Sequence, residues 1–233
     1  MRIAVYSCYF GNPEPYTPDA MGAGQGYDRI LFTDRPDLEV AEGVRREVLT
    51  AGDAGAIAAS RLPKLCPHKF LSGYDWVIYV DNRARLRVDP AAFVAVIEAR
   101  FPEGAPRTRY AFRHDRTQCI YREIKACQRM GYMTLEAREA LIAAYRAEGL
   151  PSDAGLFVNT AMVQRMGDPA ADAFNEGVFD HVTRVTRRDQ IGFAYKVWRE
   201  QFPLVVLEEG LADVVEWPLY SFRTRRRFQR GAA

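Results

Sequence analysis

Five apolar or aromatic residues, Trp76 to Val80, run without interruption into Asp81 and Asn82, and Arg83 and Arg85 follow. A strand with one face in water alternates apolar and polar residues, but this segment does not alternate. Both of its faces should therefore be covered, as in a parallel sheet with helices on either side. The segment predicts an α/β fold, and the charged residues at its end need a separate explanation.

Candidate strands and helices alternate along the rest of the chain. Apolar segments at residues 2–7, 29–33, 44–49, 110–114 and 156–163 indicate strands, the last interrupted at Asn159. Helices are expected at about 53–62, from Pro90, after a cap at Thr117, and at 134–148, 169–181 and 188–201. This alternation predicts an α/β sandwich with a mostly parallel sheet between helices.

The composition is that of a globular protein with one domain. The 233 residues can enclose a core, and 48% of them are hydrophobic. A net charge of +2 does not suggest a general nucleic-acid binder. The start of the chain does not have the pattern of a secretory signal, and no apolar run approaches the ~20 residues of a membrane helix. The four cysteines show no CxxC spacing, so we expect reduced thiols and a cytoplasmic location.

Positive charge is concentrated at the end of the chain. The arginines of this segment are Arg223, Arg225, Arg226, Arg227 and Arg230. We divide the chain into an α/β domain at residues 1–222 and a basic tail at 223–233. A solvated terminus explains the tail most simply, and weak contact with an anionic membrane surface is the alternative. Specific nucleic-acid binding is not expected, because no run of stacking aromatic residues accompanies the arginines.

Polar residues follow two of the expected strands. Asp81, Asn82 and Arg83 come directly after the apolar strand, and Thr33 and Asp34 end an earlier one. Ligands of open α/β sheets bind beyond the carboxyl ends of the parallel strands. These residues are therefore candidates for a binding site.

Three further clusters carry charge at expected element boundaries. The first is cationic and holds Arg61, Lys64, His68 and Lys69, although a solvated turn would also explain it. The second, His114 to Arg116, lies between a strand and a helix, and the third, Arg188 to Gln190, opens a helix. An aspartate at a helix start is favoured by capping and by the helix dipole alone, so Asp189 by itself does not indicate function.

In their order along the chain, these motifs resemble a glycosyltransferase-like domain family, represented in plants by the mucilage-related and turgor-regulation-defect proteins and present in bacteria. The resemblance extends from Val5 to about Trp198. The matching positions are Phe10-Gly11-Asn12, Phe32-Thr33-Asp34, Arg61, Lys64, Pro67-His68, Asp81, His114, Arg116, Tyr121, Glu123 and Arg188-Asp189-Gln190. It implies a single α/β domain of the nucleotide-sugar-binding, Rossmann-like type (GT-A-like). The implied activity is transfer of a sugar from a nucleotide diphosphate donor to a glycan or another hydroxyl acceptor.

The resemblance also suggests roles for individual residues. The donor- and phosphate-binding residues that it implies are Tyr6, Asn12, Thr33, Asp34, Arg61, Lys64, His68, Asp81, Asn82, Arg83, Arg116 and Arg188. The segment from Tyr6 to Asn12 and Thr33-Asp34 would hold the base and ribose, and Asp81 to Arg83 would face the diphosphate. Lys64, His68 and Arg116 would neutralise the departing phosphate. The implied catalytic residues are Asp189 with Gln190, as sugar contact or base, and His114 and Glu123 as second choices.

The metal requirement stays open at the level of sequence. Glycosyltransferases of this fold hold a divalent metal with a DxD motif, whereas here Asp81 is followed by Asn82 and Arg83. One carboxylate and an amide make a poor Mg²⁺ or Mn²⁺ site, and arginines can pair with phosphate directly. Mn²⁺ or Mg²⁺ at Asp81 and metal-independent action are both plausible.

Two other functions compete with the transferase. A metal-dependent hydrolase would place Asp81, His68 and His114 around a metal-bound water. A non-catalytic nucleotide- or glycan-binding module would bind the same ligands and turn nothing over.

Overall fold

The computed structural model of the protein describes residues 1–11, 14–52, 55–100 and 109–231. Its centre is a sheet with the strand order β3-β2-β1-β4-β7-β6-β8. The strands are β1 (Ile3–Tyr9), β2 (Asp28–Thr33), β3 (Val44–Val48), β4 (Trp76–Val80), β6 (Arg109–Arg113), β7 (Phe157–Arg165) and β8 (Val205–Val206). Among them β7 pairs antiparallel with β4 and β6, and the other pairs are parallel. The predicted mostly parallel α/β sheet is confirmed.

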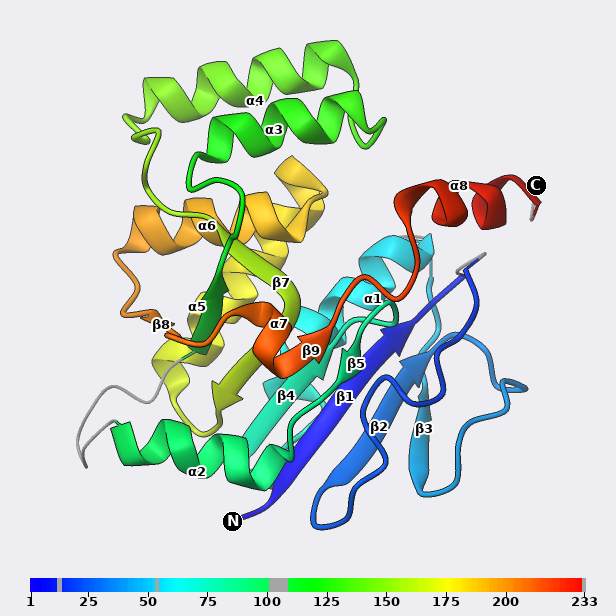
Figure 1. The fold of residues 1–233 in the computed structure, drawn as a ribbon. Coiled ribbons are helices and arrows are strands. Elements are labelled where there is room, and N and C mark those ends of the chain that lie inside the picture. Colours follow the sequence, from blue (N-terminus) through cyan, green and yellow to red (C-terminus); the bar gives the residue numbers. More distant parts are fainter. Residues whose placement is uncertain (12–13, 53–54, 101–108, 232–233) are drawn as a thin grey trace.

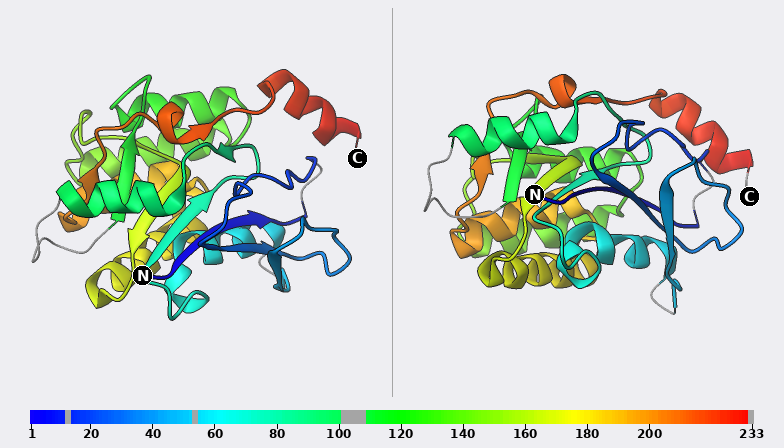
Figure 2. Two further views of the ribbon diagram at one scale, coloured as in Figure 1. Left: turned by 60° about the horizontal axis from the view of Figure 1, so that its bottom comes forward. Right: turned by 90° about the horizontal axis from the view of Figure 1, so that it is seen from below.

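Helices cover both faces of the sheet, as Figure 2 shows from below. One face carries α1 (Gly55–Leu65), α5 (Pro169–His181) and α6 (Asp189–Glu200), and the other carries α2 (Pro90–Arg100). The helices α3 (Ile120–Arg129) and α4 (Leu135–Ala147) lie outside α6, at the top of Figure 1.

Shorter elements complete the fold. The strands β5 (Arg85–Leu86) and β9 (Val215–Glu216) form a second, small sheet. A 3-10 turn, η1 (Pro67–Lys69), follows α1, and a π-helical turn, η2 (Val182–Thr186), follows α5. The short helix α7 (Leu211–Val214) precedes β9, and α8 (Phe222–Gly231) ends the described chain. None of the helices in the described ranges is long and apolar enough to cross a membrane.

The lack of alternation in β4 has the expected cause. All five of its residues are buried. Ile78 and Val80 pack in the core cluster that contains α2, whereas Val77 and Tyr79 pack in the cluster on the α1 side. Both faces of the strand are covered, so both must be apolar.

Three boundaries differ from the sequence prediction. The helix α1 continues through Pro63, because burial of Pro63 to Leu65 stabilises its last turn despite the missing N–H. Thr117 does not cap α3, which starts after Cys119; instead its Oγ1 accepts a hydrogen bond from the Cys119 N–H at 3.1 Å. The strand β7 is continuous at Asn159, and the irregularity there is a shift in its register with β6.

The described part of the basic tail belongs to the helix α8, in which Arg223, Arg226 and Arg227 are exposed and Arg225 contacts the domain. The Arg225 guanidinium in α8 lies 2.5 Å from Oε1 of Glu14, which is 2% exposed and follows β1. The Tyr220 hydroxyl donates to Oε2 of Glu14 at 2.6 Å. Figure 1 shows α8 beyond the carboxyl end of β1. A buried carboxylate needs such partners, so these contacts hold the C-terminal segment in place.

Candidate functional site

The candidate site lies on the sheet face that carries α1 and α6. Its centre is Asp189, the first residue of α6. Oδ2 of Asp189 lies 2.6 Å from Nζ of Lys64, and Oδ1 lies 3.7 Å from Nη2 of Arg61, both in α1. Lys64 and Asp189 are 3% and 6% exposed. Together with Arg188, these residues form what we call the cation cluster: Arg61, Lys64, Arg188 and Asp189.

The cations of this cluster set the ionisation of Asp189. Burial by itself raises the pKa of the carboxyl, but Arg61, Lys64 and Arg188 lower it, and the result is a pKa well below the usual range. Asp189 is therefore ionised at neutral pH. A carboxylate with so low a pKa is a weak proton acceptor, which argues against its use as a general base.

Aromatic side chains of the sheet support Lys64. Its Nζ lies 4.6 Å above the Tyr79 ring, and the Tyr6 hydroxyl donates to its backbone carbonyl at 3.0 Å. The two tyrosine rings pack edge to face at 5.3 Å. Burial raises the pKa of the nearby Cys8 thiol to about 12, against the opposing effect of Lys64 and Arg61, so this thiol is protonated and unreactive. Tyr6, which sequence assigned to the donor, positions the lysine.

Arg188 connects the cation cluster to α3 and to the turn after it. Its guanidinium lies 4.2 Å from the Tyr132 ring. Burial lowers the pKa of Arg188, but nearby groups led by Asp189 and including Glu123 outweigh this effect and raise it. Glu123 is buried in α3, where its Oε1 accepts from the Cys127 thiol at 3.4 Å. The structure thus brings Glu123 to the margin of the cluster.

Asp81, Asn82 and Arg83 have different surroundings. Asn82 is fully engaged: its amide donates to Pro15 O at 2.8 Å and accepts from the Thr17 N–H at 2.9 Å. Arg83 donates to Tyr220 O at 3.1 Å. Asp81 is half-buried, and its charge acts on Cys8 and on Tyr79 in the cluster. Asn82 and Arg83 thus hold the neighbouring loops, while the charge of Asp81 acts on groups next to the cation cluster.

The segment that contains Gly11 and the one that contains Thr33 and Asp34 are joined by hydrogen bonds. Both carboxylate oxygens of Asp34 lie 3.0 Å from the Gly11 backbone nitrogen. Gly11 has a φ of 42°, and a Cβ there would lie 2.7 Å from Cβ of Ala56, so only glycine fits. Thr33 is buried and accepts from the Arg35 N–H at 3.2 Å. These contacts shape the loop after β1; Asn12 lies outside the described residues.

The remaining predicted site residues are not part of the cation cluster. His68 binds α5, with Nδ1 3.4 Å from Asp172 and Nε2 3.2 Å from Glu176. Nδ1 of His114 accepts from two N–H groups of its own turn, including that of Arg116, whose side chain is exposed. Gln190 is half-buried next to Asp189. No contact among the described residues joins His68, His114 and Asp81, the set that a hydrolase would need.

Sequence reasoning missed one buried cation. Arg109 is 2% exposed, and its Nη1 donates to Asn175 Oδ1 at 2.8 Å. Burial lowers its pKa to about 10, while Tyr6, Cys66 and Asp189 act to raise it. An arginine at the start of a short strand carries no signal of burial. It adds positive charge behind the cation cluster.

The residues present do not fit a divalent metal. In the described ranges, no three His, Cys, Asp or Glu side chains converge on one point. Asp81 is the one carboxylate at the end of β4, and the amide of Asn82 is already paired. The neighbouring cations, Arg61 and Lys64, would repel a metal ion.

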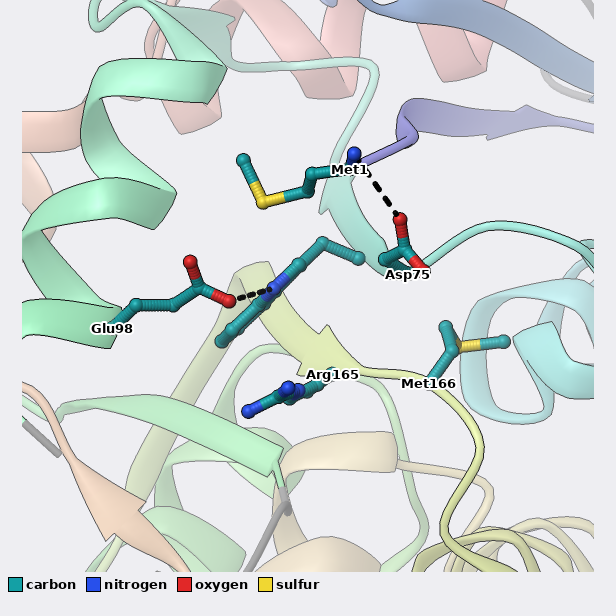
Figure 3. A pocket seen from close by; sticks show the side chains of 6 residues that line it. Met1, Asp75, Glu98, Arg165 and Met166 are labelled. Atoms are coloured by element: carbon teal, nitrogen blue, oxygen red, sulfur yellow. Dashed lines mark hydrogen bonds and ion pairs between the residues drawn. The ribbon is translucent and has the colours of Figure 1, made fainter. Parts of the chain in front are cut away.

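A surface pocket lies at the other end of the strands, away from the cation cluster (Figure 3). Its volume is about 240 Å³, and its lining is Met1, Asp75, Trp76, Glu98, Arg165 and Met166. Trp76 starts β4, so the pocket lies at the amino end of the parallel strands. Ligands of open α/β sheets bind at the carboxyl ends, which is where the strand-end residue Asp81 lies.

Comparison with known families gives one match. The model of the "TOD1/MUCI70, glycosyltransferase-like domain" family matches residues 54–208, more than half of the chain. The chain belongs to this family. No curated protein matches it. The matched region contains all four residues of the cation cluster and excludes Glu14 and α8.

Proposed function

We propose that this member of the TOD1/MUCI70 family transfers a sugar from a nucleotide diphosphate donor to a hydroxyl acceptor. The observation that carries the proposal is the charge of the cation cluster. Arg61, Lys64 and Arg188 surround a single carboxylate, and Arg109 lies behind them. A buried excess of positive charge costs several kcal/mol unless an anion compensates it. The diphosphate of a sugar nucleotide supplies that charge.

In this proposal, protein cations take the place of a divalent metal. Arg61 and Arg188 carry guanidinium groups, which bind phosphate oxygens through two parallel hydrogen bonds. The Nε atoms of both are buried and make no hydrogen bond to the described residues. The same cations would stabilise the charge that develops on the leaving phosphate. The arrangement therefore favours metal-independent binding.

The two carboxylates have separate roles in the proposed reaction. Asp189 holds Lys64 and Arg61 in place and, with its low pKa, is not the base. Asp81, at the end of β4, is the carboxylate available to the transferred sugar or to the acceptor hydroxyl.

A non-catalytic nucleotide-binding module is the second candidate. The low pKa of Asp189 favours it, because the most deeply buried carboxylate of the site is unsuited to proton transfer. The two candidates differ in turnover. A transferase releases the nucleotide diphosphate from its donor when an acceptor is present, whereas a binding module does not.

Thermal-shift measurements with UDP, GDP, CMP and their sugar conjugates test the proposal, each with Mn²⁺, with Mg²⁺ and with EDTA. Ligand at a hundred times its Kd adds about 2.7 kcal/mol to the free energy of unfolding. We expect a selective shift with one nucleotide diphosphate that survives EDTA. The variant Arg61→Gln should lose this shift and Lys69→Gln, on an exposed residue outside the cluster, should keep it. Absence of a shift with every nucleotide would refute the proposal.

A further inference from the structure

Asn159 in β7 is a buried polar side chain that has no hydrogen-bond partner among the described residues. It is 4% exposed, and neither its Nδ2 nor its Oδ1 makes a hydrogen bond to the described residues. Buried side-chain amides are nearly always hydrogen-bonded, because an unpaired polar group in the interior lowers stability. A second buried amide shows the usual situation: Asn175 in α5 bonds both Arg109 and Gln164. Asn159 lacks the hydrogen bonds to neighbouring side chains that Asn175 makes.

The strand irregularity determines where Asn159 lies. Val158 and Ala161 both pack in the core cluster that contains α2. Strict alternation would place residues three apart on opposite faces of the sheet. The register of β7 with β6 shifts by three residues of β7 between Val163 and Val158, whereas β7 keeps a regular register with β4 from Arg165 to Ala161. The alternation of β7 is therefore interrupted between Val158 and Ala161. Alternation from Ala161 puts Thr160 on the other face, which carries α1 and α6. We place the interruption between Asn159 and Thr160, because this turns the polar Asn159 to the same face and away from the apolar cluster of Val158 and Ala161.

This position adjoins the end of β4. The Asp81 N–H donates to the Thr160 carbonyl at 2.8 Å, so Asn159 is one residue from the partner of Asp81. α6, which begins with Asp189, packs on β7. The unpaired amide thus lies on the same sheet face as the cation cluster and beside the carboxylate at its edge.

We propose that Asn159, together with Asp81, binds hydroxyl groups of the sugar carried by the nucleotide. The inference rests on the proposed function. It assigns the diphosphate and the sugar of the donor to two different sets of residues. The cation cluster takes the charged diphosphate. The amide of Asn159 both donates and accepts, and the Asp81 carboxylate accepts, which is the combination that a hydroxyl group satisfies. A phosphate does not suit this surface, because Asp81 would repel it.

The first test compares two buried amides in the absence of ligand. Asn159→Leu keeps the branch at Cγ and removes the unpaired amide, whereas Asn175→Leu makes the same increase in volume and removes a paired one. In urea denaturation, Asn159→Leu should have an unchanged or higher midpoint and Asn175→Leu a lower one. A fall of the Asn159→Leu midpoint as large as that of Asn175→Leu would show that Asn159 has a partner within the protein and would overturn the inference.

The second test separates sugar binding from nucleotide binding. We expect Asn159→Leu to keep the wild-type Kd for the nucleotide diphosphate within about twofold and to weaken binding of its sugar conjugate about tenfold. Equal affinity of the wild type and Asn159→Leu for the conjugate would refute the role of Asn159 and leave the proposed function intact.

A third measurement covers failure of the proposed function itself. If the wild type binds no nucleotide, saturation-transfer NMR with methyl glycosides of glucose, galactose and xylose still probes the surface directly. A signal that Asn159→Leu abolishes would keep the sugar site without the transferase. No signal in the wild type would overturn both proposals.

Discussion

Among the described residues, Glu14 and Asp189 are buried carboxylates held by cations from distant segments, and they differ in the number of their short contacts. Glu14 forms a short ion pair with Arg225 and accepts a hydrogen bond from the Tyr220 hydroxyl. Asp189 has one short contact, to Lys64, while Arg61 lies 3.7 Å away. Glu14 has two short contacts and Asp189 has one. Nε atoms without a hydrogen bond to the described residues lie at both places: that of Arg83 beside Glu14, and those of Arg61 and Arg188 in the cation cluster.

This difference teaches where to look for a ligand. Glu14 joins the loop after β1 to the C-terminal helix, and each of its two carboxylate oxygens has a short partner, at 2.5 and 2.6 Å. The cation cluster joins α1 to α6 with more positive than negative charge, and an anion would complete it. Arg225 links the two regions. Its Nη1 donates at 2.9 Å to the hydroxyl of Tyr132, and the guanidinium of Arg188 lies over the ring of the same tyrosine.

The largest expected effect is that of Lys64→Met. It leaves the Asp189 carboxylate buried without its short partner, so the free energy of unfolding should fall by about 3–5 kcal/mol, and nucleotide binding should be lost. The double variant Lys64→Met/Asp189→Leu should recover most of the stability in urea denaturation without recovering binding. If binding returns together with stability, the cluster is not the anion site.

A smaller loss is expected from Glu14→Gln. It weakens the contacts to Arg225 and Tyr220, so unfolding should become easier by about 2 kcal/mol. Calorimetric titration should give a nucleotide Kd within about twofold of the wild type. A large change in Kd with an unchanged urea midpoint would reverse the roles that we assign to the two carboxylates.

Near neutral pH, the cation cluster should not contribute to the pH dependence of stability. Asp189 stays ionised there, whereas burial lowers the pKa of His181 to about 4, with a further lowering by Lys196. The His181 ring stacks on that of Tyr195, which also stacks on Tyr145, while Glu148 and Asp180 raise the pKa of His181. Its pKa is lower in the folded than in the unfolded state, so the unfolded chain binds more protons and stability falls as the pH falls.

We therefore expect the free energy of unfolding to decrease between about pH 6.5 and pH 4, by on the order of 1–2 kcal/mol after solvent screening. Urea denaturation across this range measures it, and His181→Phe should flatten the profile. A profile of unchanged slope in that variant would assign the acid sensitivity to another group.

The smallest effect is expected from metal removal. Because the described residues offer no divalent-metal site, EDTA should change the Kd for the nucleotide diphosphate by less than about twofold. Isothermal titration with and without Mn²⁺ measures this. A Kd that rises tenfold in EDTA would mean that Asp81 recruits a metal with the ligand itself.

Local patterns in the amino-acid sequence predicted the main elements and the family. The apolar run of β4 and the proline that starts α5 are readable because they depend on neighbouring residues, whereas the predicted cap at Thr117 was wrong. The sequence predicts that Asp81, Asn82 and Arg83 at the exit of β4 face the diphosphate, but it does not predict their partners within the protein. Asn82 bonds to residues 15 and 17, and Arg83 bonds to Tyr220, far along the chain.

Only the tertiary structure decided which charges are buried and which are paired. Lys64 and Lys69 look alike in sequence, yet Lys64 is enclosed against Asp189, while Lys69 is exposed and pairs with Glu176. The antiparallel direction of β7, the register shift that turns Asn159 and the folding back of α8 also depend on contacts between distant segments. Periodicity reports which face of an element is apolar, but burial of a charge depends on partners that only the folded chain brings together.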